Sequence, residues 1–273
     1  VDRPEAQSVV SAGRFAGKSL GELWNEHGEE VFGAAVEKRD RFPLLMKILD
    51  AADVLSIQVH PPNPIAGQLG GESKTEMWYI AAAEPGAKLY IGLREGVDAD
   101  QFRDAIENGS VEETLNVLEP KAGDFIFIPS GRLHAIGAGL LIYEIQENSD
   151  TTYRVYDWNR LGLDAKPRQL HVEEALQSIN FADPEPQLGV AEGTVLVDCD
   201  EFTVQRMEVP PGESKTIAGE GEFAIVTVVQ GAIQCGQFRF TPGQFFAIPA
   251  AANGGCDIAA SSRAQMLVTT LPS

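Results

Sequence analysis

Four side chains in the sequence could together bind one divalent metal ion. Gln58 and His60 alternate with Ile57 and Val59 in the segment SIQVH, so they share a face if this segment is a strand. Glu76 begins the apolar segment EMWYI, and His134 follows the turn PSGR. Each histidine alone could be an ordinary half-buried strand residue. Two imidazoles, a carboxylate and an amide oxygen together suit Zn²⁺ and leave a position for water or substrate, which predicts a catalytic metal site.

Short β-rich segments bounded by Gly and Pro must position these ligands. They lie at 55–60, 77–82, 88–93, 124–129 and 140–146, and again at 226–236, 237–249 and 265–271. Antiparallel pairing of such strands could bring the four ligands together. Strands of this length and spacing favour a sandwich or a barrel, so we predict a mainly β fold.

Three segments with helical spacing interrupt the β-rich pattern. The first covers 98–109. Ser110 and Glu113 then form a capping-box sequence, which predicts that another helix begins there. The third segment covers 171–180. We expect these helices to be short insertions in a β scaffold.

The sequence contains a degenerate internal repeat. The segment GDFIFIPSGRLHAIG, which starts at Gly123, resembles GQFFAIPAAANGGCD, which starts at Gly243. The position of His134 in the first copy is occupied by Gly254 in the second. We therefore expect the second copy to be structural and to bind no metal.

A turn-rich stretch separates the two copies. Two prolines interrupt regular structure in ADPEPQLG at 182–189. This stretch is the predicted boundary between a metal-binding catalytic domain over 1–185 and a smaller β domain without metal over 186–273.

Composition argues against several classes of partner. The formal net charge is −19, from 21 basic and 40 acidic side chains. Nucleic acid and anionic membranes are bound through clustered Lys and Arg, so neither is an expected partner. A small phosphorylated substrate remains compatible, because a few local cations can reverse the potential inside one cleft.

The cysteines and the apolar segments favour a cytoplasmic protein. Cys199, Cys235 and Cys256 are odd in number and have no metal-ligand spacing, so we expect no disulfide framework. No apolar segment approaches the roughly 20 residues that span a bilayer, and the first residues have no secretory pattern.

The segment that ends at His134 resembles a known motif. Gly123, Pro129, Gly131 and His134 have the spacing of the second cupin motif, in which a tight turn directs a metal-binding histidine into a barrel. The resemblance implies two cupin-type jelly-roll barrels. The usual first cupin motif supplies two histidines and a glutamate, and the sequence departs from it by having Gln58.

With Gln58 at this position, the sequence resembles the type I phosphomannose isomerases. The segments QVHPPN, KTEMWYI and EIQENSDTTYR are similar to blocks of this family, and YDWNR is similar to its short bacterial form. The resemblance extends over about 41–160. Family members ordinarily carry a further segment before the stretch similar to GKSLGEL at 17–23, so we expect the first segment to be missing here.

The resemblance implies a reaction and roles for further residues. One Zn²⁺ per chain would support interconversion of mannose 6-phosphate and fructose 6-phosphate through an enediol. Arg154 matches an arginine that stabilises the enediolate, and Lys74 matches a lysine of proton transfer or substrate contact. Glu144 is the candidate general base, and Asp150 is the competing carboxylate.

Several remaining residues could serve the substrate, but spacing alone does not choose among them. The candidates for the phosphate are Ser56, Arg132, Arg160 and Lys47.

The other histidines and the three tryptophans have separate expectations: the tryptophans could line a sugar cleft or lie in the core. His27 and His171 match no motif, and we predict that neither binds the metal. Trp24 and Trp78 are expected in the core, whereas Trp158 could lie in the core or line a sugar cleft.

Two alternative functions remain open. A mononuclear iron cupin oxygenase could use a similar set of ligands. A non-catalytic sugar-binding cupin could keep the metal site without turnover. Gln58, Arg154 and Lys74 favour a sugar phosphate over dioxygen chemistry.

Overall fold

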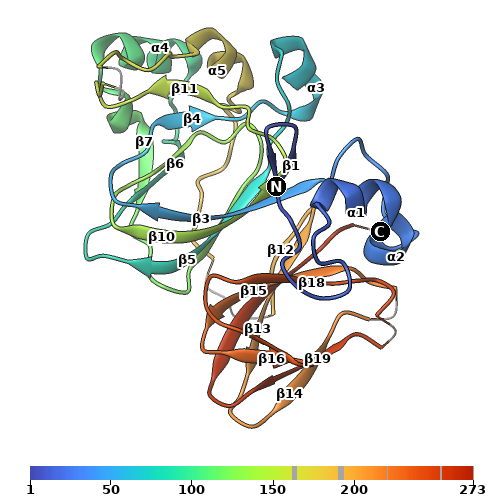
Figure 1. The fold of residues 1–273 in the computed structure, drawn as a ribbon. Helices are drawn as coiled ribbons and strands as arrows, with labels where there is room; N and C mark the ends of the chain where they lie inside the picture. The colour runs from blue at the N-terminus through green and yellow to red at the C-terminus, as the bar shows by residue number, and fades with distance from the viewer. Residues whose placement is uncertain (162–164, 190–193, 220, 253, 273) are drawn as a thin grey trace. The chain divides into compact units, whose positions relative to one another are not determined.

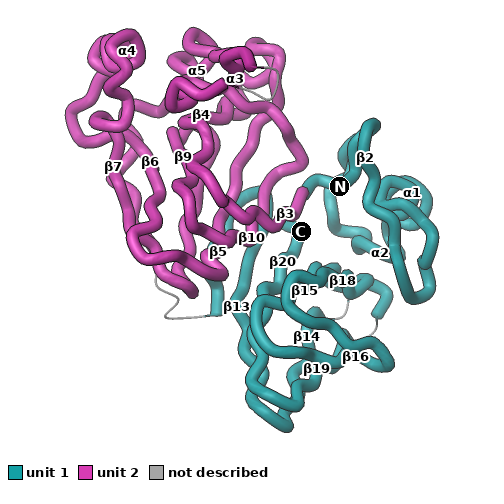
Figure 2. Tube along the Cα trace, turned by 60° about the vertical axis from the view of Figure 1, so that its left-hand side comes forward, with its two compact units in different colours: residues 1–44, 191–273 teal, residues 45–190 magenta. Residues whose placement is uncertain are grey.

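Strands dominate the structure, and the expectation of a mainly β fold is confirmed. The computed structural model describes residues 1–161, 165–189, 194–219, 221–252 and 254–272. The chain forms two units, coloured separately in Figure 2 and labelled by element in Figure 1. Unit 2 is Leu45–Val190, and unit 1 joins Val1–Leu44 to Ala191–Ser273.

The strands of unit 2 form two sheets. The four-stranded sheet has the order β3-β10-β5-β8, and the five-stranded sheet has the order β11-β4-β9-β6-β7. Their bounds are β3 Leu44–Ala51, β4 Ile57–Val59, β5 Glu76–Ala83, β6 Leu89–Leu93, β7 Leu115–Leu118, β8 Phe125–Ile128, β9 His134–Ile136, β10 Leu140–Glu147 and β11 Tyr153–Tyr156.

Two buried apolar layers fix which strand residues face the site. One layer contains residues from both sheets, including Trp78, Ile136 and Ile142. The other lies on the opposite face of the five-stranded sheet, where Val59 packs with Phe102 of a covering helix. Because strand side chains alternate, the neighbours of Val59 in β4 face the four-stranded sheet.

Short helices cover the outer face of the five-stranded sheet. They are α4, Ala99–Asn108, and α5, Val172–Ser178, which lie beside β4 and β11 in Figure 1, with α3, Asn63–Ala66, nearby in the chain. Asp98 caps α4 through a capping box with Gln101. The helices predicted at 98–109 and 171–180 are therefore present.

The helix predicted to begin at Ser110 is wrong. Ser110 makes no side-chain cap hydrogen bond, and only one 3₁₀ turn, Val111–Thr114, precedes β7. Leu115 pairs with Leu93 of β6 and is fully buried, so sheet pairing and burial override the local capping signal.

Unit 1 repeats the sheet order of unit 2. Its sheets run β12-β13-β20-β15-β18 and β14-β19-β16-β17, so the last four strands of the first correspond to β3-β10-β5-β8 and the second corresponds to β4-β9-β6-β7. The bounds are β12 Val195–Asp198, β13 Thr203–Val209, β14 Ser214–Ile217, β15 Ala224–Gln230, β16 Ile233–Cys235, β17 Phe238–Phe240, β18 Phe245–Ile248, β19 Cys256–Ala260 and β20 Ala264–Thr270. The internal duplication inferred from the sequence is thus visible in the topology.

The division into units differs from the predicted domains at the N-terminus. The segment Val1–Leu44 belongs to unit 1 rather than to the metal-site unit. It contains β1 Asp2–Arg3, β2 Ala6–Gln7, α1 Leu20–Glu26 and α2 Gly28–Phe32. Rings of Trp24, Phe32 and Phe42 pack together, and Phe32 and Phe42 also contact Phe223. This aromatic cluster joins segments that are remote in sequence, which no local pattern could indicate.

The expectation of no disulfide is also wrong. Cys235 and Cys256 form a disulfide, with Cα atoms 6.6 Å apart. Strands β16 and β19 are paired, and Cys235 lies opposite Ile258, only two residues from Cys256. Cys199 is the free cysteine among the described residues. Sheet pairing, which the sequence spacing does not reveal, therefore brings the two thiols together.

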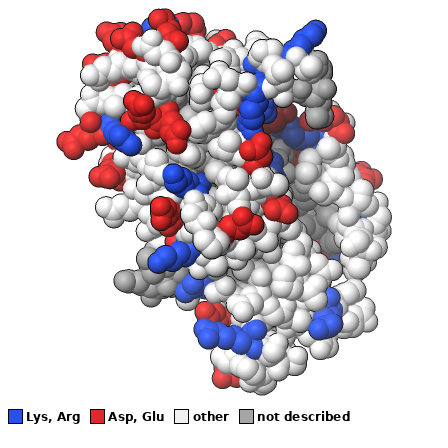
Figure 3. Space-filling model, turned by 90° about the vertical axis from the view of Figure 1, so that its left-hand side faces the viewer, with Lys and Arg blue, Asp and Glu red and all other residues white. Residues whose placement is uncertain are grey.

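Surface charge and helix length complete the description. On the face shown in Figure 3, acidic and basic side chains are mixed over most of the surface. No helix in the described parts of the chain has the length and apolar character needed to cross a membrane.

Candidate metal centre and active site

The four predicted metal ligands come from facing sheets of unit 2. Gln58 on β4 is the register partner of His134 on β9, and His60 directly follows β4. Glu76 is the first residue of β5 in the other sheet. Because Ile57 belongs to the layer beneath the helices, Gln58 points to the opposite side, toward the sheet that carries Glu76.

The turn before His134 is held against His60. Gly131 has φ +89, in the left-handed region that favours glycine, and its N–H donates to the His60 carbonyl at 2.8 Å. Its own carbonyl accepts from the Asn180 N–H at 2.9 Å. The PSGR turn therefore fixes the backbone positions of both histidines relative to each other.

Three of the ligands converge on one point. Candidate ligand atoms of His60, Glu76 and His134 all lie within 4.8 Å of one another. Glu76 Oε1 is 3.4 Å from His134 Nε2, and Glu76 Oε2 is 3.6 Å from His60 Nε2. The arrangement is that of a compact N₂O donor set.

Backbone carbonyls orient both imidazoles toward Glu76. His60 Nδ1 lies 2.7 Å from the Thr151 carbonyl, and His134 Nδ1 lies 2.9 Å from the Arg132 carbonyl. A carbonyl can only accept, so each Nδ1 carries the proton and each Nε2 presents a lone pair. Burial lowers the pKa of His134 to about 4 and holds the pKa of His60 well below its usual value. Both rings are therefore neutral at pH 7 and suited to bind a metal ion.

Glu76 is a buried carboxylate with Lys74 as its charged neighbour and room for a second cation between it and the two imidazoles. Its side chain is fully buried, and neither oxygen has a hydrogen-bond partner among the described residues. Lys74 Nζ lies 3.0 Å from Oε2, close enough for an ion pair but not directed as a hydrogen bond. Burial raises the pKa of Glu76 to about 7, despite the opposing effect of Lys74. A divalent ion between this carboxylate and two Nε2 lone pairs would satisfy it, so the residues fit a metal.

Gln58 lies beside the same point. Its Nε2 is 3.3 Å from His134 Nε2, and its Oε1 is 3.5 Å from the Ser56 hydroxyl. Rotating the amide by half a turn exchanges its oxygen and nitrogen without other change. In that orientation the oxygen faces His134, which makes Gln58 a possible fourth ligand.

Glu144 lies next to the candidate metal-binding group, which consists of His60, Glu76 and His134. Two hydrogen-bond donors hold its carboxylate. Its Oε1 accepts from Lys47 Nζ at 3.0 Å, and its Oε2 accepts from Trp78 Nε1 at 2.9 Å. Burial acts to raise the pKa of Glu144, but Lys74 and Lys47 outweigh it and the net pKa is lowered. Glu144 is therefore an ionised buried carboxylate, whereas Asp150, the competing base, is exposed.

Lys74 is buried within this charged group. Its Nζ lies 3.3 Å from His60 Nε2, in addition to the Glu76 contact. Burial alone would lower the pKa of Lys74, but the carboxylates of Glu76 and Glu144 raise it above its usual value. Lys74 is thus a charged ammonium at the edge of the candidate metal position.

Arginines line a pocket that shares Gln58 with the metal-binding group. The pocket, of about 360 Å³, is bordered by Ser56, Arg154, Arg160 and Arg168. Arg154 Nε donates to the Ser56 hydroxyl at 3.1 Å. Burial and the charges of Arg168 and Arg160 lower the pKa of Arg154, as expected for crowded cations. Such a cluster favours an anionic ligand.

The structure separates the four phosphate candidates. Ser56 and Arg160 line the arginine pocket, whereas Lys47 lies beside Glu144. Arg132 is used structurally, because its guanidinium holds Asp183 through contacts of 2.6 and 2.8 Å. Sequence reasoning missed Arg168, which no motif marks.

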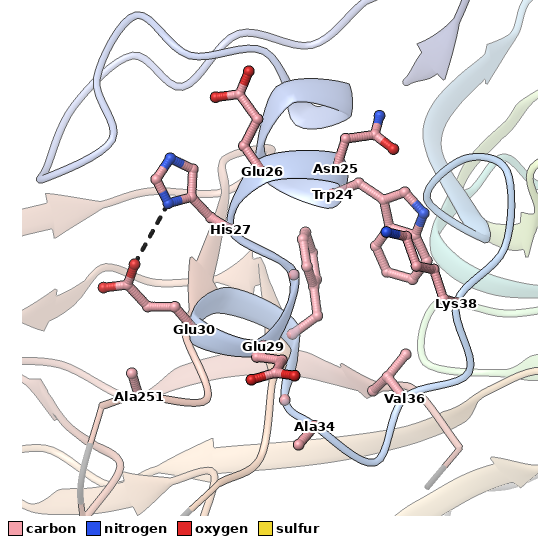
Figure 4. A pocket seen from close by; sticks show the side chains of 13 residues that line it. Trp24, Asn25, Glu26, His27, Glu29, Glu30, Ala34, Val36, Lys38 and Ala251 are labelled. Carbon is pink, nitrogen blue, oxygen red and sulfur yellow. Dashed lines mark ion pairs between the residues drawn. The ribbon is translucent and has the colours of Figure 1, made fainter.

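A pocket of about 810 Å³ in unit 1 contains none of the predicted ligands or catalytic residues. It is lined by α1 and α2, and Figure 4 shows His27 turned toward Glu30, 3.5 Å away. His171 occupies the N-cap position of α5 in unit 2 without a side-chain capping hydrogen bond, and it accepts from the Arg154 N–H at 3.4 Å. Neither histidine belongs to the metal-binding group.

The tryptophans occupy packed positions. Trp24 and Trp78 are buried, as predicted. Trp158 is partly buried, packs against Tyr90 with ring centroids 5.3 Å apart, and donates to the Leu55 carbonyl at 2.8 Å. Of the two predicted positions, core or cleft, Trp158 therefore takes the one in the core, packed beside the five-stranded sheet.

Unit 1 has an alanine where unit 2 has its metal-binding carboxylate. Glu76 pairs with Ile128 at the start of β5, and Ala224 pairs with Ile248 at the start of β15. Among the described residues, the metal-binding group of His60, Glu76 and His134 has no counterpart in unit 1.

Comparisons with known proteins identify the family of the chain. Residues 2–85 match the family described as phosphomannose isomerase type I, catalytic domain. Mannose-6-phosphate isomerase of Streptococcus mutans is 38% identical over 257 residues, which cover 90% of this chain and 79% of that protein. The crystal structure of mannose 6-phosphate isomerase from Bacillus subtilis has a TM-score of 0.83 and 31% identity, covering 98% of this chain and 86% of that one.

A more distant structure shares the fold alone. It is a mannose 6-phosphate isomerase bound with zinc and yttrium, with a TM-score of 0.68 and 17% identity, covering 94% of this chain and 87% of that one. The identity to the curated relative over nine-tenths of the chain assigns the family. The chain belongs to the mannose-6-phosphate isomerase family.

Proposed function

We propose that the chain is a zinc-dependent isomerase that interconverts mannose 6-phosphate and fructose 6-phosphate. The observation that carries the proposal is the compact donor set of His60, Glu76 and His134, in which a fully buried carboxylate, ion-paired with Lys74 but without a hydrogen-bond partner among the described residues, faces two imidazole lone pairs. His60, Glu76, His134 and Gln58 would hold the ion. Zinc, when bound, supplies a Lewis acid that polarises oxygen atoms of the substrate.

Glu144 is the proposed base that moves the proton between C2 and C1. It removes the C2 proton of the aldose, and the released electron pair forms the C1–C2 double bond of an enediolate. The C1 carbonyl oxygen takes up the negative charge, a proton then passes from the C2 hydroxyl to O1, and Glu144 returns its proton to C1 as the C2 carbonyl of the ketose forms. The ionised, buried state of Glu144 supports this role, because a carboxylate must be deprotonated to accept a proton.

Lys74 and Arg154 are proposed to balance the negative charge of the enediolate. Lys74 is charged and buried beside His60, and Arg154 lines the pocket that includes Gln58. Preorganised cations stabilise developing charge strongly where water is excluded. The exposed Asp150 is assigned no proton-transfer role in this proposal.

The arginine pocket is the proposed site of the substrate phosphate. Arg160 and Arg168 both contact Asp157, so one carboxylate faces two guanidinium groups there, with Arg154 nearby. Asp50 and Asp53 also line the pocket, and Asp53 lies 3.4 Å from Arg160, so the phosphate would bind through the directed guanidinium donors rather than through an excess of positive charge.

Replacing Arg168 with glutamine is expected to raise KM for mannose 6-phosphate by about 10-fold with little change in kcat. Loss of one charged hydrogen bond costs about 1.5–3 kcal/mol, and the lower end of this range corresponds to about 10-fold. Steady-state kinetics measures the effect. Arg103→Gln is the matched control, because Arg103 forms an exposed ion pair with Glu173 in the same unit. An equal rise in KM in both variants would contradict the phosphate assignment.

The direct test of the proposed activity is formation of fructose 6-phosphate from mannose 6-phosphate by the purified, zinc-loaded chain, followed by NMR. The family assignment favours neither the oxygenase nor the non-catalytic sugar-binding alternative. Turnover excludes the non-catalytic alternative, whereas binding of mannose 6-phosphate without turnover would support it. Oxygen consumption during the assay would support the oxygenase.

The cytoplasm is the proposed location, and a small phosphorylated sugar is the proposed partner. The Cys235–Cys256 disulfide is unusual for that compartment, since cytosolic thiols are generally kept reduced.

A further inference from the structure

A continuous chain of side-chain hydrogen bonds crosses three neighbouring strands beside the metal-binding group. Trp78 on β5 donates to Glu144 on β10, and Lys47 on β3 donates both to Glu144 and to Gln146 on β10. Glu144 is the register partner of Trp78, so adjacent strands hold the two side chains on the same face. The order β3-β10-β5 places the strand of Glu144 and Gln146 between the other two.

Gln146 anchors one end of this chain to the backbone. Its Nε2 donates to the carbonyls of Glu147 at 2.6 Å and Ser149 at 2.8 Å. Both amide hydrogens are thereby used, so the amide cannot rotate without losing two hydrogen bonds. The side chain is fully buried, and its oxygen must face Lys47. Lys47 is therefore held between two fixed acceptors.

Trp78 anchors the other end. Its indole N–H can only donate, and it fixes Glu144 Oε2 without adding a charge. The ring is 1% exposed and meets the His134 ring edge-on, with centroids 5.4 Å apart and an interplanar angle of 85°. One side chain therefore contacts both a candidate metal ligand and the proposed base.

We propose that Trp78 and Gln146 are positioning residues that hold the Glu144–Lys47 pair in one orientation for proton transfer. The inference rests on the proposed isomerase function. Two donors on different oxygens restrain rotation of the Glu144 carboxylate, and the anchored amide restrains Lys47. Proton transfer requires such alignment, because a misplacement of about 1 Å can cost on the order of 100-fold in rate.

Trp78→Phe and Gln146→Met test the proposal, because each keeps most of the side-chain volume and removes the hydrogen bonds. Each variant is expected to lower kcat by about 10-fold, with KM within about twofold of the wild type and zinc content unchanged. The isotope effect on kcat with mannose 6-phosphate deuterated at C2 is expected to rise, because proton transfer becomes slower. A loss of folded protein would lower kcat without changing the isotope effect.

Matched controls separate positioning from general packing. Trp24→Phe removes an indole hydrogen bond to the Arg39 carbonyl in unit 1, and Gln177→Met removes an amide hydrogen bond to the Glu173 carbonyl on α5. Neither control is expected to change kcat or the isotope effect. If Trp78→Phe and Gln146→Met behaved like these controls while the wild type turned over, the positioning role would be overturned and the isomerase function would stand. An inactive zinc-loaded wild type would overturn the function and this role with it.

An activity-independent measurement tests the contact itself. The sequence has three tryptophans, so each indole N–H can be assigned in a proton–nitrogen NMR spectrum by substitution. Glu144→Gln replaces a charged acceptor with a neutral one, and the Trp78 resonance is expected to move upfield. An unchanged Trp78 resonance would show that the indole does not bind Glu144 in solution.

Discussion

Replacing His134 with alanine is expected to remove bound zinc and to lower kcat/KM by about 1,000-fold or more. His134 offers a lone pair fixed by the Arg132 carbonyl, and it lies 3.4 Å from Glu76. A catalytic metal ion contributes several kcal/mol to stabilising charge in the transition state, and each 1.36 kcal/mol is tenfold in rate. Metal analysis and steady-state kinetics on the same preparation measure both effects.

His27→Ala is the matched control for this substitution. His27 is a partly exposed histidine of unit 1, ion-paired with Glu30, and its loss should leave zinc content and turnover unchanged. Full zinc occupancy and normal turnover in His134→Ala would mean that the metal is bound elsewhere, and the proposed centre would be wrong.

Replacing Glu144 with glutamine is expected to lower kcat by about 100-fold to 10,000-fold while zinc remains bound. The amide has nearly the same shape and can still accept from Trp78 or Lys47, but it cannot accept the C2 proton. General acid–base catalysis typically contributes rate factors of this size. Kinetics together with zinc analysis separates loss of the base from loss of the metal.

Asp150→Asn decides between the two carboxylates. Asp150 is exposed, so its replacement is expected to change kcat by less than about threefold. The opposite ranking, with Asp150→Asn severely impaired and Glu144→Gln active, would transfer the role of base to Asp150.

The metal-binding group was predictable because two short-range signals locate it. Alternation in SIQVH places Gln58 and His60 on one face, and the glycine turn before His134 directs that side chain inward. Glu76 became a candidate because antiparallel pairing could bring the start of its strand beside the other three side chains, and the resemblance to a family then supported it. The mainly β fold followed from the length and spacing of the short β-rich segments bounded by Gly and Pro.

The remaining features depend on contacts between residues far apart in the sequence, which local patterns do not predict. Lys47 reaches Glu144 only because β3 lies beside β10, and Cys235 meets Cys256 only because β16 pairs with β19. The N-terminal helices join unit 1 through an aromatic cluster around Phe223, which their sequence does not indicate. At Ser110 the local signal was misleading, because burial of Leu115 in the sheet outweighs a capping box worth about 1 kcal/mol.

The most direct test of zinc-dependent isomerisation is the turnover of mannose 6-phosphate by one preparation before chelation, after chelation and after zinc is restored. We expect fructose 6-phosphate formation to fall by about 1,000-fold in the metal-free protein and to recover when one zinc per chain is added. His134→Ala, treated in parallel, should not recover. Undiminished turnover by protein shown to contain no metal would contradict the account.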